Sequence, residues 1–477
     1  MTHQLEDLEK AGNAVREFTS PRAKWMSKLE QFVAGTQYQG LPDYFTADVP
    51  LWERAPCIVD AVVKSAIDSN SDLCLGEGRF PTVTIRPAEA DDDLDDSLLS
   101  EDESALLDRF VEIVHRQVRF ETLCREVFAS GQGCGSAAAI FGVRAGKLFA
   151  DTTRAKWCTP TLDPSGAVTS MAIEYAYVDY RKQQNGKTKA VALAYRRVID
   201  AEKDTTFLPV ELKDNGAPMG GWKADASQTF VHGLGFCPVV WYPHMLGCEA
   251  VNRFDGHAIH ENLLDELRAH DMALSMRHRA ALFAGDPQWV EIGVKPGYNP
   301  SGDGREAMIP TTAKGGPASA TNPIEGFYRS KGTDSAPRRK KGPGQIWQYG
   351  DPQTKVELIT LPADALKAID DHAHDLRVKL SEGLGVVNLD PDNLKFAATT
   401  SGAALRVLKG RQTDKCDQYR SDFGDRFVLP ATSMLLRICH VTNKRGATLR
   451  VPGIAKLAPV LAKFDVPDEV SEVSDVA

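Results

Sequence analysis

Two helical patterns separated by a short non-periodic stretch lie in residues 361–430, and they constrain the fold more than any other feature of the chain. The first pattern has apolar residues at spacings of three and four, which is typical of a helix with one buried stripe. Pro362 precedes it, where a missing N–H costs nothing, and Gly383 and Gly385 favour a stop. The apolar stripe consists of Leu366, Ile369, Ala373, Leu376 and Leu380.

The second pattern begins near Ser401-Gly402, after a connection at residues 386–396 that has no helical period. Proline removes a donor and clashes with the preceding turn, so we expect Pro430 to kink or end this second helix. Its apolar positions are Leu405, Leu408, Cys416, Tyr419, Phe423 and Phe427.

Composition describes a globular chain whose charge does not favour tight binding of nucleic acid. The 477 residues are 42% apolar and 25% charged, enough for a sizeable core in several sub-domains. The net charge of −9 argues against a basic face that grips nucleic acid. It does not exclude a protein that encloses DNA and lets it slide.

The cysteines and the N-terminus point to assembly in the cytoplasm. Nine cysteines without a C-x-x-C pair favour neither a metal site nor a disulfide framework, and no cofactor is expected. Residues 1–10 are polar, so we expect no signal peptide. The chain has no run of 18 apolar residues, so no membrane partner is expected.

The first hundred residues predict helices and one acidic loop. Residues 1–35 are expected to form two helices divided at Pro21, and Leu51–Asp72 one strongly apolar helix that leads into a strand at residues 81–85. Residues 89–103 hold nine acids and no base. Such a run is typical of a solvated loop, and the alternative is a surface for a basic partner.

A glycine-rich turn after the next helix, Ala105–Ser130, invites a nucleotide-site interpretation that its context opposes. The glycines at 131, 133 and 135 follow a helix and precede a strand-like run, residues 137–143. A phosphate-binding loop needs a strand before it and a helix N-terminus after it. We therefore expect a structural turn.

Residues 146–243 alternate short β-like runs with turn signals, which predicts an antiparallel region and an α+β fold class. A helix follows at 258–283, where seven formal charges predict an exposed or subunit-facing helix. We expect His257, His260, His270 and His278 to be surface or interface residues, because no cysteine or paired carboxylate completes a metal site.

Residues 288–360 are strand-like at both ends, at 289–292 and 355–359, and irregular between them. The stretch 301–345 contains eight glycines and five prolines, a composition of loops. It also contains a basic tetrad, which is either a solubilising loop or a contact for an acidic partner. The tetrad is Arg338, Arg339, Lys340 and Lys341.

The order helix, exposed loop, Ser-Gly and long helix at 361–430 resembles the portal proteins of tailed double-stranded DNA bacteriophages. The segment Gly235-Phe236-Cys237-Pro238-Val239-Val240 is similar to the G-x-x-P-V-V strand that precedes the first stem helix in that family. The resemblance implies a portal fold: an α/β wing, two stem helices, a small mixed clip, and a long kinked helix below a short α-helical crown. Its expected ranges are 1–250 (wing), 251–285 (first stem helix), 286–361 (clip), 362–385 (second stem helix), 386–400 (tunnel loop), 401–445 (long wing helix) and 446–477 (crown and tail).

The resemblance also implies a function without catalysis. Portal proteins form a ring of about twelve copies at one capsid vertex, and double-stranded DNA passes through the ring without sequence specificity during packaging and ejection. Their partners are the large terminase, which hydrolyses ATP, the head–tail adaptor, and the major capsid protein with its scaffold. The expected location is the portal vertex of the virion, after assembly in the cytoplasm of a bacterial host.

By the same resemblance the tunnel loop would touch DNA and the tetrad at 338–341 would meet the terminase or an adaptor. Lys395 would contact phosphates, with acidic neighbours that keep the contact weak; the alternative is that it faces solvent at a helix start. The loop residues in question are Asn388, Asp390, Asp392, Asn393 and Lys395.

Two other classes of function remain open at this stage. The chain has no G-x-S-x-G, H-E-x-x-H or G-x-x-x-x-G-K-[ST] motif. Triads assemble from distant residues, however, so a soluble mixed α/β enzyme with an unrecognised site is the first alternative. A different ring or adaptor component of a virion is the second.

Overall fold

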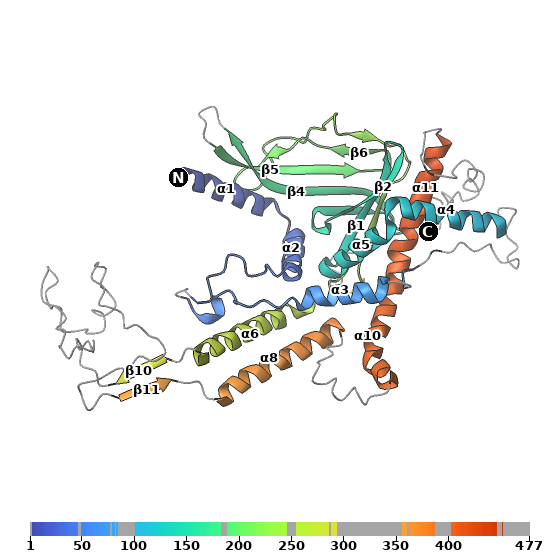
Figure 1. Ribbon diagram of the computed structural model, residues 1–477. Coiled ribbons are helices and arrows are strands. Elements are labelled where there is room, and N and C mark those ends of the chain that lie inside the picture. The colour runs from blue at the N-terminus through green and yellow to red at the C-terminus, as the bar shows by residue number, and fades with distance from the viewer. Residues whose placement is uncertain are drawn as a thin grey trace, which may run out of the picture. The chain divides into compact units, whose positions relative to one another are not determined.

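The computed structural model describes residues 2–45, 49–76, 79–81, 83, 101–182, 188–245, 254–285, 288–292, 355–359, 363–386, 402–445 and 451. The chain divides into two compact units, Met1–Met272 with His374–Ala477, and Ala273–Ala373. Helices and antiparallel sheets make it an α+β protein, as the sequence predicts (Figure 1).

The N-terminal pair of helices forms as predicted. Helix α1 (Thr2–Phe18) and helix α2 (Pro21–Ala34) are separated by Ser20, whose side chain accepts a hydrogen bond from the Ala23 N–H. Pro21 stands in the first turn of α2, where no N–H is needed.

The helix predicted over Leu51–Asp72 is wrong in its first half. Residues 51–53 form only a single 3-10 turn, η1 (Leu51–Glu53), and helix α3 begins at Val62 and ends at Leu75. Pro56 interrupts the predicted helix, because a proline inside a helix removes a hydrogen bond and clashes with the preceding turn. Most of the predicted strand at 81–85 and of the acidic run lies outside the described residues.

The single helix predicted over Ala105–Ser130 is two helices, α4 (Glu101–Val118) and α5 (Phe120–Cys134). Arg119 between them has a φ of 53°, a left-handed conformation that interrupts the helix. Helix α5 continues through the glycine run to Cys134, and strand β1 starts at Ser136. The order helix, turn, strand excludes the phosphate-loop geometry there.

The predicted antiparallel region forms two sheets. The smaller has the order β2-β1-β9, and the larger the order β3-β4-β5-β6-β8, with β7 paired to β5. Helix α1 lies on one face of β4 and β5 (Figure 1). The strands are β1 (Ser136–Arg144), β2 (Lys147–Thr153), β3 (Cys158–Leu162), β4 (Val168–Lys182), β5 (Thr188–Ile199), β6 (Lys203–Thr206), β7 (Val210–Glu211), β8 (Phe230–Val231) and β9 (Val239–Pro243).

The largest core lies where α4, α5 and β1 meet the helical segment at residues 402–444. Helix α10 (Gly402–Phe423) passes through a π turn, η4 (Gly424–Val428), directly into α11 (Leu429–Lys444). The Phe423 ring packs edge-on against the rings of Phe128 and Tyr242, 5.1 Å from each.

Pro430 does not end this helix, contrary to one of the two expected outcomes. The π turn lies just before Pro430, because the Leu429 N–H donates to the Gly424 carbonyl five residues back. The wider turn accommodates the proline, which has no N–H to donate to an earlier carbonyl. The continuous path from 402 to 444 agrees with the predicted long helix.

Candidate functional site

An antiparallel helix pair is the part of the structure that the sequence patterns anticipate best. Helix α6 (Leu264–Gly285) follows a 3-10 turn, η3 (Glu261–Leu263), and helix α8 spans Ala363–Leu384. In the larger unit, Leu380 of α8 belongs to the same buried cluster as Leu264 and Leu267 of α6. In the smaller unit, the Arg277 guanidinium is 2.7 Å from the Asp370 carboxylate.

Two strands connect this helix pair within the smaller unit. Strand β10 (Gln288–Ile292) pairs antiparallel with β11 (Lys355–Ile359), from Gln288 opposite Ile359 to Ile292 opposite Lys355. Both strands confirm the sequence prediction. Along the chain, the order of the described elements is therefore α6, β10, β11 and α8.

The two glycines near the end of α8 have different roles. Gly385 has a φ of 72° and follows the last helical residue, so it provides the predicted stop. Gly383 lies inside the helix, where a Cβ would stand 2.8 Å from a methyl carbon of Leu263. A side chain at this position would require Leu263 to move, so the glycine serves close packing and the expectation that Gly383 stops the helix is corrected.

Helix α8 has a stripe of acidic residues opposite its buried stripe. Four acids follow one another along α8 at intervals of seven, four and seven residues. Because each residue turns the helix by about 100°, their side chains lie within about 40° of one another around the helix axis. All four are exposed, whereas Ala373, Leu376, Leu380 and Leu384 on the other side are buried. We call the set Asp364, Asp371, Asp375 and Glu382 the acidic stripe.

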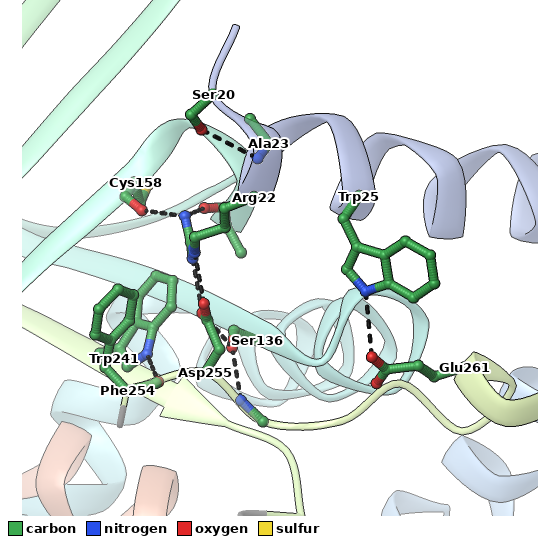
Figure 2. A network of polar contacts seen from close by, with 12 residues as sticks. Ser20, Arg22, Ala23, Trp25, Ser136, Cys158, Trp241, Phe254, Asp255 and Glu261 are labelled. Atoms are coloured by element: carbon green, nitrogen blue, oxygen red, sulfur yellow. Dashed lines mark hydrogen bonds and ion pairs between the residues drawn. The ribbon is translucent and has the colours of Figure 1, made fainter. Parts of the chain in front are cut away.

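The start of the helix pair is anchored by a half-buried arginine of α2 (Figure 2). The Arg22 guanidinium donates two hydrogen bonds to the Asp255 carboxylate, at 2.5 and 2.7 Å. Its Nη1 group donates to the carbonyl oxygens of Ala155 at 3.2 Å and Cys158 at 2.8 Å. This planar fork matches the carboxylate, which explains why arginine rather than lysine stands here.

Further contacts fix the segment that leads from Asp255 to α6 (Figure 2). The Ser136 hydroxyl donates to Asp255 at 3.2 Å, and the Trp241 indole donates to the Phe254 carbonyl at 2.6 Å. The Trp25 indole N–H donates to the Glu261 carboxylate at 3.2 Å. We call Arg22, Asp255 and these partners the anchor network.

A second carboxylate, Asp271, ties a loop to the middle of α6. It accepts hydrogen bonds from the Gln37 amide at 3.1 Å, the Tyr38 hydroxyl at 2.9 Å and the Asp60 N–H at 2.9 Å. Asp271 is only 3% exposed, and burial raises its pKa to about 6. Three donors from both ends of residues 37–60 thus meet on one side chain of α6.

The histidines near α6 do not all lie at the surface. His260 and His270 are buried, which corrects the expectation of surface or interface positions. The His260 ring donates from Nε2 to the Leu29 carbonyl at 3.2 Å, and burial lowers its pKa to about 4. His257 binds Glu261 at 3.1 Å, and His278 is exposed.

The residues that the resemblance singled out lie outside the described residues. This holds for the loop residues Asn388, Asp390, Asp392, Asn393 and Lys395 and for the basic tetrad Arg338–Lys341. Their positions remain predictions. The anchor network and the Asp271 contacts, in contrast, were not predicted from sequence. The sequence did contain one signal for the Asp271 contacts: Asp271 stands at a position where the helical spacing after Leu264 and Leu267 calls for an apolar residue.

Within the ranges that the structure describes, no group of three or more histidine, cysteine or acidic side chains is arranged to hold a metal ion. No helix in the same ranges is long and apolar enough to cross a membrane. Comparisons of the chain with models of known families and with curated proteins found no match. Within the larger unit, the start of α6 is held by the anchor network and by the contacts of Asp271.

Proposed function

We propose that this chain is the subunit of a portal-type ring through which double-stranded DNA passes during genome packaging and ejection. The observation that carries the proposal is the antiparallel hairpin α6, β10, β11, α8, inserted between the closing strand β9 and the long helix from 402 to 444. The order α/β region, helix, strand pair, helix and long helix is that of the portal plan stated from the sequence.

The acidic stripe gives this proposal a physical basis for sliding. In a closed ring, each copy presents the same helix face, so the stripe would repeat around the channel wall. Carboxylates repel phosphates, whereas a basic wall would bind DNA tightly and release it slowly. At physiological salt this repulsion acts over a Debye length of about 8 Å.

The remaining assignments follow from the ring. The subunit itself would hydrolyse no ATP and need no cofactor, and the large terminase would dock with the tetrad at 338–341, followed later by the head–tail adaptor. The loop at 386–400 would touch DNA through Lys395. The ring would lie at one vertex of a virion, in contact with the major capsid protein and scaffold, after assembly in a bacterial cytoplasm.

A charge-neutralised ring tests the role of the stripe. The variant is Asp364→Asn, Asp371→Asn, Asp375→Asn and Glu382→Gln together. The control neutralises exposed acids elsewhere, with Glu9→Gln, Glu112→Gln, Glu202→Gln and Asp214→Asn.

Both variants should assemble, and only the stripe variant should retain DNA in the ring at low salt and slow its packaging into procapsids with the cognate motor. The retention should weaken as salt is raised. Equal DNA retention and equal packaging by the two variants would remove the stripe from the proposal.

A further inference from the structure

The described residues of the loop between α2 and α3 include large exposed apolar side chains. Trp52 is 77% exposed, Phe45 50% and Leu41 42%. Aromatic side chains bury about 150–250 Å² when they are covered, so Trp52 and Phe45 are the largest apolar side chains that this loop offers to a partner. We call the described residues of 37–60 the tethered loop.

The tethered loop is held in place before any partner arrives. Both of its ends bond Asp271, as described above, and inside it the Arg54 guanidinium donates to the carbonyls of Val49 at 2.8 Å and Tyr44 at 2.9 Å. The buried Tyr44 ring supports Phe45 edge-on at 5.1 Å. A pre-ordered contact surface loses little conformational entropy on binding.

A complementary surface lies on the larger sheet of the same chain. The Trp157 and Tyr175 rings are 4.7 Å apart, Tyr175 and Tyr195 4.8 Å, and Tyr175 and Tyr177 6.1 Å. Tyr175 and Tyr195 are paired across β4 and β5, on the face opposite the one that α1 covers. We call these four residues the aromatic ladder; Tyr177 is 36% exposed and the others are half-buried.

Charge favours contact between the two surfaces. The tethered loop carries Asp43 and Glu53, while exposed Arg154 lies over the Trp157 ring at 5.2 Å and Lys189 is exposed on β5. Opposite charges at the margin of an apolar contact speed association and set its orientation.

The occupant of the ladder is a second copy of this chain rather than the chain's own loop. The ends of the loop are bonded to α6, so Trp52 and Phe45 remain exposed, and Tyr177 of the ladder remains exposed in the same chain. Contact between two different patches leaves one of each free on every pair of copies. Such a heterologous contact continues until the ring closes.

We infer that the tethered loop docks through Trp52 and Phe45 onto the aromatic ladder of a neighbouring copy. The inference rests on the proposed ring for its biological setting. The contact itself is a property of two surfaces on the described chain, and it can be tested without DNA or a motor.

A photo-crosslinking amino acid at position 52 tests the docking directly. Mixed heavy- and light-isotope samples distinguish crosslinks between copies from those within one. We expect crosslinks between copies that map to peptides holding Trp157, Tyr175, Tyr177 or Tyr195. Crosslinks that map to another surface, or none between copies at any assembly-competent concentration, overturn the inference.

Substitutions test the energetic weight of the contact. Trp52→Ala should weaken assembly at least about tenfold, as loss of a central aromatic does. Phe230→Ala, a change at another ring that is 57% exposed, should not weaken it. Far-ultraviolet circular dichroism confirms that both variants fold, and assembly by Trp52→Ala at the parental concentration would contradict the inference.

A charge swap separates this inference from the proposed function. If Glu53 of one copy meets Arg154 of the next, Arg154→Glu should weaken assembly and adding Glu53→Arg should restore it; failure of the restoration overturns that pairing. If rings form but the crosslinks lie elsewhere, the inference fails and the portal proposal stands. If the crosslinks reach the ladder in open chains or pairs without a ring, the portal proposal fails and the docking stands.

Discussion

Replacing Arg22 with methionine should strongly destabilise the larger unit, because the substitution leaves a carboxylate without its main partner. The side chains of Arg22 and Asp255 are 17% and 13% exposed, so water replaces the lost donors poorly. Asp255 would keep the Ser136 hydroxyl, and the carbonyls of Ala155 and Cys158 would lose their donor. Removing one member of a buried pair costs about 3–5 kcal/mol, and we expect a loss in that range.

A double-mutant cycle measured by urea unfolding isolates the pair. Trp241 beside the network makes fluorescence a suitable probe. Arg22→Met combined with Asp255→Asn should recover most of the loss, because neither charge is left unpaired. The stability of Arg22→Lys should lie between that of the parent and that of Arg22→Met, because lysine keeps the charge but lacks the planar guanidinium that bonds both carboxylate oxygens. A cost below about 1 kcal/mol for Arg22→Met, or purely additive effects, would refute the reasoning.

Three further predictions concern the helix pair. Asp271→Ala should lower the free energy of unfolding in urea by about 2–4 kcal/mol, because it leaves buried donors without an acceptor. Asp271→Asn should cost less, because its amide N–H can donate to the Tyr38 oxygen. Equal costs for the two variants would contradict this. Burial lowers the pKa of His260 to about 4, below its unfolded value of about 6.5, so the stability present above pH 6.5 should fall by up to about 3 kcal/mol as pH drops toward 4. His260→Gln should remove that part of the pH dependence in parallel unfolding curves, and an unchanged pH profile would show that His260 is not its source. Gly383→Val should lower the free energy of unfolding by about 1–3 kcal/mol, because the new side chain meets Leu263. An unchanged free energy of unfolding would contradict the prediction and would mean that α8 shifts away from Leu263.

The sequence predicts elements well where one physical signal dominates. The apolar spacing of α8 and the stop at Gly385 predict that helix without reference to the rest of the chain. The prediction fails where a local exception decides the path. Pro56 prevents the first half of the helix predicted at 51–72, and the left-handed backbone at Arg119 divides another helix. Nothing in the apolar pattern around Arg119 indicates that break.

The contacts that anchor the helix pair depend on tertiary structure, which a pattern along the chain cannot supply. Arg22 and Asp255 are 233 residues apart, and neither is unusual in its local sequence. The acidic stripe could have been read from spacing alone once the helix was predicted. The loop and tetrad expected from the resemblance lie outside the described residues, so the sequence remains their only support.

The mass of the purified protein under native conditions tests the central claim most directly. A ring subunit should give one dominant assembly of about twelve copies at micromolar concentration and moderate salt, with a central channel in electron micrographs. Opposing acidic faces within the channel are tolerated because salt screens them. A stable monomer or compact dimer under these conditions, with no ring at any salt concentration, would contradict the account.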